Sequence, residues 1–165
     1  MTDFAATLGA LVRHDVAFIV VGGAAAIAHG SVRLTSDLDI VYQRSPANLD
    51  KLVTALAEYN PYLRGAPPGL PFQWDRATLQ RGLNFTLISS LGEIDLLGEI
   101  PGGGTYQDLL PGAIEISVFG MRCRCLSLPQ LIRAKRAAGR PRDLEVLAEL
   151  EAIDEETGTC KQTKG

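Results

Sequence analysis

The sequence predicts one domain of the α/β or α+β class, and three observations support this prediction. The chain has 165 residues, of which 46% are hydrophobic, and this is enough for one sizeable core. Short apolar runs typical of strands occur between segments of helical periodicity. No apolar run approaches the ~20 residues that a membrane-spanning helix needs. We therefore expect strands and helices around a single core, and no membrane partner.

The strands are predicted from period-two alternation or from short apolar runs. They cover residues 16–23, 38–42, 83–89, 93–98 and 113–120, and residues 121–127 are placed to pair back on the last of these. Helical spacing of apolar residues marks the N-terminal segment and residues 24–29, 46–59, 128–138 and 141–153. Ser45 followed by Pro46 fits a helix start. The Pro- and Gly-rich residues 61–74 and 101–108 are expected to be loops.

The domain is expected to span residues 1–154, and a polar, frayed tail is expected over residues 155–165. The N-terminal segment has no basic leader, so we do not expect a signal peptide. Three cysteines are an odd number for a disulfide framework and too few ligands for zinc. Cys123 and Cys125 are expected to share one face of a strand as idle thiols, in a reducing cytoplasm. The net charge of −3 gives no global field that attracts nucleic acid.

Two aspartates interrupt the apolar run at residues 37–42. In a strand, Asp37 and Asp39 would point to the same face with Cα atoms ~7 Å apart, and their negative charges would repel. A divalent cation between them removes this problem, because Mg²⁺ is held by carboxylates together with substrate phosphates. Asp95, in another apolar strand, offers a third carboxylate. The alternative is structural: these aspartates cap turns or form salt bridges with Arg33 and Arg44.

Gly22 and Gly23 lie where a predicted strand ends and a helix begins. Glycines at this place let backbone N–H groups approach a phosphate closely. Close packing of the strand against the helix explains the same two glycines without a ligand.

Lys135 falls on the apolar stripe of the predicted helix 128–138. There it either extends its amine to solvent or binds an anion such as a triphosphate. Residues 133–142 hold five basic side chains, which form either an anion-binding patch or a solvated linker paired with Asp143 and Glu145.

Four other side chains have simpler expected roles. Arg33 either neutralises a phosphate or pairs with Asp37. His29 is expected at a helix end, in a packing role. Trp74 and Tyr106 are expected to fill the core or the surface rather than to stack on a nucleobase.

These motifs together resemble a known superfamily. Gly22-Gly23, then Thr35-Ser36-Asp37-Leu38-Asp39, then Asp95 resemble the signature of DNA polymerase β-like nucleotidyltransferases. The stretch "HGSVRLTSDLDI" and residues 128–150 are similar to the minimal and type IV toxin–antitoxin (AbiEii-like) branch. The resemblance implies a mixed sheet flanked by helices, with C-terminal helices. Many relatives have Ser where this chain has Gly23.

The resemblance also implies a function. It implies Mg²⁺-dependent (or Mn²⁺-dependent) transfer of NMP from an NTP to an acceptor hydroxyl on an RNA end, a protein or a small molecule. Asp37, Asp39 and Asp95 would hold the metal, and Asp95 could act as the general base. The nucleotide-binding residues would be Gly22, Gly23, Arg33, Thr35, Ser36 and Lys135. A cognate toxin or antitoxin protein is an implied partner. The alternative is a nucleotide-binding or partner-binding protein without catalysis.

Overall fold

A seven-stranded mixed sheet organises the chain, with the strand order β3-β4-β5-β2-β1-β9-β8. The structure is a computed structural model that describes the backbone of residues 2–162 and the side chains of residues 2–158. The strands of this sheet are β1 (Phe18–Val21), β2 (Asp37–Tyr42), β3 (Tyr62–Leu63), β4 (Phe85–Ser89), β5 (Gly92–Leu97), β8 (Ile114–Val118) and β9 (Met121–Cys125). A separate pair consists of β6 (Glu99–Ile100) and β7 (Gly104–Thr105). The expected mixed sheet flanked by helices is therefore confirmed.

The centre of the sheet joins strands that are far apart in the sequence. Strand β2 runs antiparallel to β1 and parallel to β5. Leu38, Ile40 and Ile94 point into the core and have no exposed surface. Because successive side chains of a strand alternate between faces, Asp39 and Asp95 lie on the opposite face.

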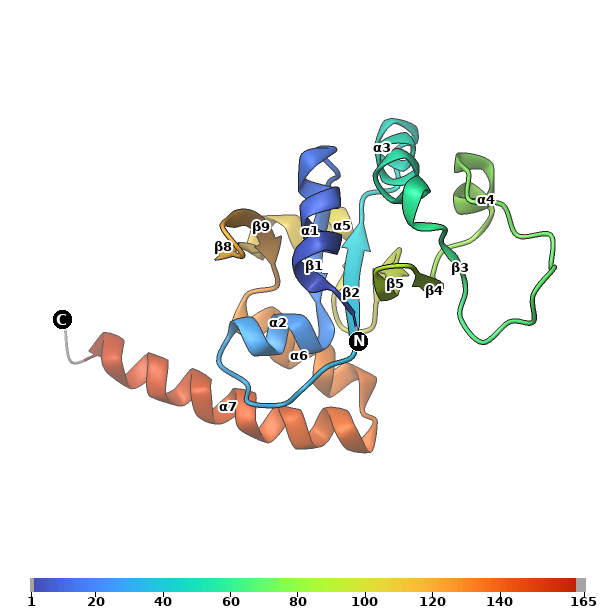
Figure 1. Cartoon of the computed structure of the whole chain (residues 1–165). Helices are drawn as coiled ribbons and strands as arrows, with labels where there is room; N and C mark the ends of the chain where they lie inside the picture. The colour runs from blue at the N-terminus through green and yellow to red at the C-terminus, as the bar shows by residue number, and fades with distance from the viewer. Residues whose placement is uncertain (1, 163–165) are drawn as a thin grey trace.

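Helices surround this sheet. They are α1 (Phe4–Arg13), α2 (Gly22–Ala28), α3 (Pro46–Leu56), α4 (Arg76–Arg81), α5 (Tyr106–Leu109), α6 (Leu128–Ala138) and α7 (Pro141–Gln162), with short 3-10 turns at Ala57–Tyr59 and Leu110–Gly112. Helix α1 contacts α3, whereas α6 contacts both α2 and α7. Figure 1 shows α6 and α7 on the side of the molecule away from α3 and α4. No helix within the described residues is long and apolar enough to cross a membrane.

The helix starts follow the local signals in the sequence. Ser45 accepts a hydrogen bond from Asn48 N across 3.3 Å and caps α3 ahead of Pro46. Ser127 and Gln130 form a reciprocal capping box at the start of α6. Helix α6 ends at Gly139, whose φ of +65° is the left-handed conformation that favours glycine.

The structure differs from the expected elements in several places, one of which is strand β3 (Tyr62–Leu63) inside the segment 61–74 that we expect to be a loop. The helix expected at 141–153 continues to Gln162, so helical backbone enters the segment expected as a polar tail; residues 163–165 lie outside the described residues. Asp75 accepts from Thr78 N across 2.7 Å and starts α4, which is too short to show clear periodicity. Another difference is at residues 101–108, which hold β7 and most of the one-turn helix α5. A Cβ on Gly102 would lie 2.8 Å from Arg133 O, so this segment packs tightly on α6.

The expected packing roles of several side chains agree with the structure. Cys123 and Cys125 are free, buried and on one face of β9, whereas the Cys160 side chain lies outside the described residues. His29 Nε2 lies 2.7 Å from Leu126 O. Trp74 Nε1 donates to Val53 O across 3.0 Å, and Tyr106 is buried in the core.

Candidate active site

Three carboxylates converge on the face of the sheet opposite to Leu38, Ile40 and Ile94. Asp37 and Asp39 lie two residues apart on β2, and the parallel pairing with β5 places Asp95 directly opposite Asp39. One carboxylate oxygen from each residue lies within 4.8 Å of the other two. The structure therefore brings together the aspartates whose charges had no local explanation in the sequence.

The electrostatics of this triad favour a bound cation. Burial raises the pKa of Asp39 to about 8, with added repulsion from the charges of Asp37 and Asp95. Burial also raises the pKa of Asp95, an effect that Arg64 opposes. Within the described residues, Asp39 Oδ1 is buried and has no hydrogen-bond partner. A divalent ion with oxygen ligands would satisfy this atom and offset the repulsion, so the residues present fit Mg²⁺ or Mn²⁺.

The two glycines are required by close contacts with the residues around the triad. Gly22 has a φ of +64°, and a Cβ there would lie 2.2 Å from Asp39 Oδ2. A Cβ on Gly23 would lie 2.7 Å from Thr35 Oγ1. Close packing therefore accounts for both glycines, and their approach to a phosphate stays a prediction.

Thr35 and Ser36, which precede β2, differ in their position relative to the site. Thr35 Oγ1 donates to Asp37 O across 3.3 Å and lies 3.4 Å from Asp37 Oδ1. Ser36 lies away from the triad cavity, and its carbonyl oxygen accepts a hydrogen bond from the Thr2 hydroxyl. Of these two residues, Thr35 is the one that lines the cavity.

The arginines that sequence reasoning offered as partners for the aspartates are paired with other groups. Arg33 pairs with Glu145 at 3.3 Å and with Glu149 at 3.4 Å, both on α7. Arg44 donates to Leu79 O across 3.1 Å, at the far end of β2. Neither arginine has an ion pair with Asp37, Asp39 or Asp95 among the described residues, so that structural alternative is wrong in its choice of partner.

The partner is Arg64, which sequence reasoning missed. Its Nη2 lies 2.8 Å from both Asp95 Oδ1 and Leu87 O, and its Nη1 lies 3.9 Å from Asp37 Oδ2. Arg64 follows β3 directly and is the one basic residue of the segment 61–74. A single basic residue in a Pro- and Gly-rich segment was the feature of the sequence that could have identified Arg64 as a site residue.

Basic side chains from the α6–α7 junction line the same cavity, which has a volume of about 640 Å³. Lys135 is only 16% exposed, and its Nζ lies 3.3 Å from Asp143 Oδ1. Its amine therefore does not extend into solvent. The cavity is lined by all three aspartates and by Gly23, Thr35, Arg33, Lys135, Arg140 and Arg142. Positive side chains thus line the same cavity as the carboxylate triad.

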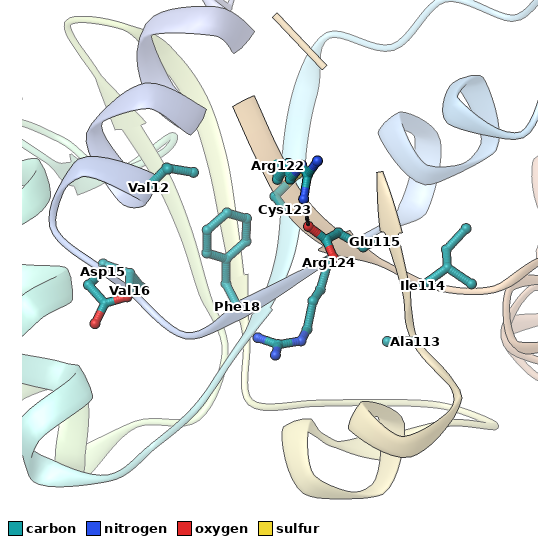
Figure 2. Close-up of a pocket in the computed structure, with 10 residues that line it drawn as sticks. All are labelled: Val12, Asp15, Val16, Phe18, Ala113, Ile114, Glu115, Arg122, Cys123 and Arg124. Carbon is teal, nitrogen blue, oxygen red and sulfur yellow. Dashed lines mark ion pairs between the residues drawn. The ribbon is translucent and has the colours of Figure 1, made fainter. Parts of the chain in front are cut away.

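A second cavity, of about 410 Å³, lies between the end of α1 and the β8–β9 pair. Figure 2 shows its lining, with Arg122 pointing toward Glu115. The two charged groups are 3.7 Å apart, and both side chains are exposed, so this ion pair contributes little to stability. No site residue predicted from the sequence lines this cavity.

Comparison with known proteins supports the same fold. No model of a protein family matches the sequence, and neither does any curated protein. Among solved structures, the lincosamide antibiotic adenylyltransferase LnuA with bound lincomycin has a TM-score of 0.56 at 16% identity, covering 88% of this chain and 92% of its own. A Thermotoga maritima protein described as a nucleotidyltransferase has a TM-score of 0.55 at 17% identity, covering 87% and 86%.

A third solved structure is ANT(2'')-Ia in complex with adenylyl-2''-tobramycin. Its TM-score is 0.52 at 15% identity, and the match covers 96% of this chain and 95% of that one. All three matches span most of both chains, at 15–17% sequence identity. The chain therefore has the fold of the nucleotidyltransferases.

Proposed function

We propose that this protein is an enzyme that transfers NMP from an NTP to an acceptor hydroxyl and releases pyrophosphate. The observation that carries this proposal is the convergence of Asp37, Asp39 and Asp95 within 4.8 Å. A cavity lined with basic side chains adjoins them. A purely structural role gives little reason for three carboxylates to repel one another at close range. It also gives little reason for Asp39 Oδ1 to be buried without a hydrogen-bond partner within the described residues.

Asp37, Asp39 and Asp95 would hold Mg²⁺ or Mn²⁺. When bound, the metal supplies neutralisation of charge on the α-phosphate and on the leaving pyrophosphate. Lys135 and the arginines around the cavity would bind the triphosphate by charge-assisted hydrogen bonds. Gly22, Gly23 and Thr35 would border the nucleotide on the β1–α2 side.

The acceptor oxygen would attack the α-phosphorus as the bond from this phosphorus to the pyrophosphate oxygen breaks. Asp95, which β5 contributes to the triad opposite Asp39, would accept the acceptor's proton. The proton would then pass from Asp95 to solvent.

A small-molecule acceptor has the most support. Of the solved structures that share the fold, one is named as a lincosamide antibiotic adenylyltransferase and another is a complex with adenylyl-2''-tobramycin. The resemblance of residues 29–40 to the AbiEii-like branch supports a different setting, a toxin–antitoxin pair with an RNA or protein acceptor. An acceptor panel distinguishes these settings directly.

The test is incubation of the purified protein with each α-³²P-labelled NTP and Mg²⁺, together with lincosamides, aminoglycosides, total RNA or cell protein. We expect label to move to one acceptor class, and Asp37→Asn to abolish the transfer while the protein stays folded by circular dichroism. Transfer by Asp37→Asn at the wild-type rate would contradict the proposal. Binding of NTP without transfer to any acceptor would favour the non-catalytic alternative.

A further inference from the structure

Asp143 is the only acidic residue within residues 2–158 that is buried, with 1% of its side chain exposed. It lies in the first turn of α7, and both of its carboxylate oxygens accept hydrogen bonds. Oδ2 accepts from Arg140 N across 3.2 Å and from Arg140 Nε across 2.6 Å. Oδ1 accepts from Lys135 Nζ and from Arg140 Nη2, each across 3.3 Å.

A helix-start role explains only part of this arrangement. A carboxylate in the first turn of a helix accepts a hydrogen bond from the preceding backbone and interacts favourably with the helix dipole. Asp143 does this through Oδ2 and Arg140 N. That role needs neither burial nor a lysine from the preceding helix. Burial raises the pKa of Asp143, yet hydrogen bonds from Arg140 and the charge of Lys135 more than offset this and lower it below its usual value.

Lys135, Arg140 and Asp143 together carry a net positive charge beside the triad cavity. One carboxylate between two cations leaves a surplus of one positive charge. Lys135, Arg140 and Asp143 all line the cavity that contains the triad, and Lys135 is close enough to lower the pKa of Asp39. A buried ion pair contributes little net stability. The position of the Lys135–Asp143 pair beside the cavity therefore needs another explanation.

Both cations keep unused donors. A lysine ammonium has three N–H groups and an arginine guanidinium has five. Asp143 takes one from Lys135 and two from Arg140. The remaining donors are held on restrained side chains, so less conformational entropy is lost when an anion binds them.

We propose that Asp143 is a positioning residue that holds Lys135 and Arg140 as a preformed pair of donors for the β- and γ-phosphates of the nucleotide. This inference rests on the proposed function, because it assigns the triphosphate to this cavity. It predicts that Asp143 contributes to discrimination between NTP and NMP, since NMP lacks the phosphates that the pair would bind.

The test measures equilibrium binding of a non-hydrolysable ATP analogue and of AMP, with Mg²⁺, by isothermal titration calorimetry. Asp143→Asn keeps the size of the side chain and an oxygen for Arg140 N but removes the charge. We expect about tenfold weaker binding of the triphosphate, as loss of one charge-assisted interaction implies, and unchanged binding of AMP. Asp75→Asn is the matched control, because it alters an aspartate that starts α4 outside the site; we expect its affinities to equal those of the wild type.

A second variant separates positioning from folding. Lys135→Gln leaves Asp143 paired with Arg140, and we expect the defects of Lys135→Gln and Asp143→Asn not to add in the double variant. Equal loss of ATP-analogue and AMP binding in Asp143→Asn, or fully additive defects, would overturn the inference. The inference would also be overturned if Asp143→Asn did not fold and Lys135→Gln bound the triphosphate with wild-type affinity. A wild type that binds NTP through this pair but transfers nothing would contradict the proposed function and leave the inference standing.

Discussion

Arg64 donates a hydrogen bond to Asp95 across 2.8 Å and reaches Asp95 from a loop on the far side of β4. The guanidinium also lies near Asp37 and Glu93, each at 3.9 Å. In the absence of metal, one positive charge is therefore shared among several carboxylates. This arrangement makes the contribution of Arg64 to stability depend on whether a cation occupies the triad.

Arg64→Ala should destabilise the metal-free protein by about 2 kcal/mol, because a hydrogen bond between charged groups is lost and the carboxylates keep their mutual repulsion. Thermal unfolding in EDTA measures this. Arg76→Ala is the control: its pair with Asp50 is exposed, so we expect a change below about 0.5 kcal/mol. Saturating Mg²⁺ should raise the Tm of Arg64→Ala more than that of the wild type. Equal metal responses would argue against a shared site.

Asp39→Asn tests the metal site without any substrate. A ligand that binds only the folded state stabilises it by about 2.7 kcal/mol at a hundredfold excess over its dissociation constant. We expect Mg²⁺ or Mn²⁺ to raise the Tm of the wild type, and Asp39→Asn to lose this response. Without metal, Asp39→Asn should melt at or above the wild-type temperature, because its amide neither repels the other carboxylates nor has to bind a proton when the protein folds at neutral pH. A destabilised Asp39→Asn, with a wild type indifferent to metal, would contradict the site.

The pKa of Asp39 predicts an unusual pH dependence. This pKa is about 8 in the folded protein and 3.8 in a free side chain, so the folded state holds a proton that the unfolded state releases between these values. The stability from this group is complete below pH 3.8 and is lost as the pH rises through about 8. Urea titrations in EDTA between pH 4 and 9 should show the wild type losing stability relative to Asp39→Asn. Parallel pH profiles for the two proteins would contradict this prediction.

Gly23→Ser tests whether the serine expected from the resemblance to the nucleotidyltransferase superfamily fits here. A Cβ at this position would lie 2.7 Å from Thr35 Oγ1 and 2.9 Å from Thr35 Cβ, so we expect a loss of stability of about 1–3 kcal/mol from overpacking. Thr35→Gly should relieve part of this loss in the double variant. Gly158→Ser is the control, because Gly158 is also helical but has nothing within 4 Å. Chemical denaturation measures the free energy of unfolding of the wild type, Gly23→Ser, the double variant and Gly158→Ser. A Gly23→Ser as stable as the wild type would contradict this prediction and show that Thr35 moves freely.

Local rules account for the parts of the site that the sequence determined by itself. Period-two alternation places Asp37 and Asp39 on one face of β2, because neighbouring apolar residues must point into the core. Capping chemistry sets the start of α6, and Gly139 sets its end. These features depend on residues within a few positions of one another.

Tertiary structure decided which distant residues meet these local elements. Asp95 lies opposite Asp39 because β5 pairs with β2 in one parallel register, and Arg64 reaches the triad because β3 pairs with the edge of β4. Asp143 is buried because α7 folds back on α6, which turns a helix-start aspartate toward Lys135. Strand register and helix packing follow from burial summed over the whole core, so no local pattern in the sequence carries them.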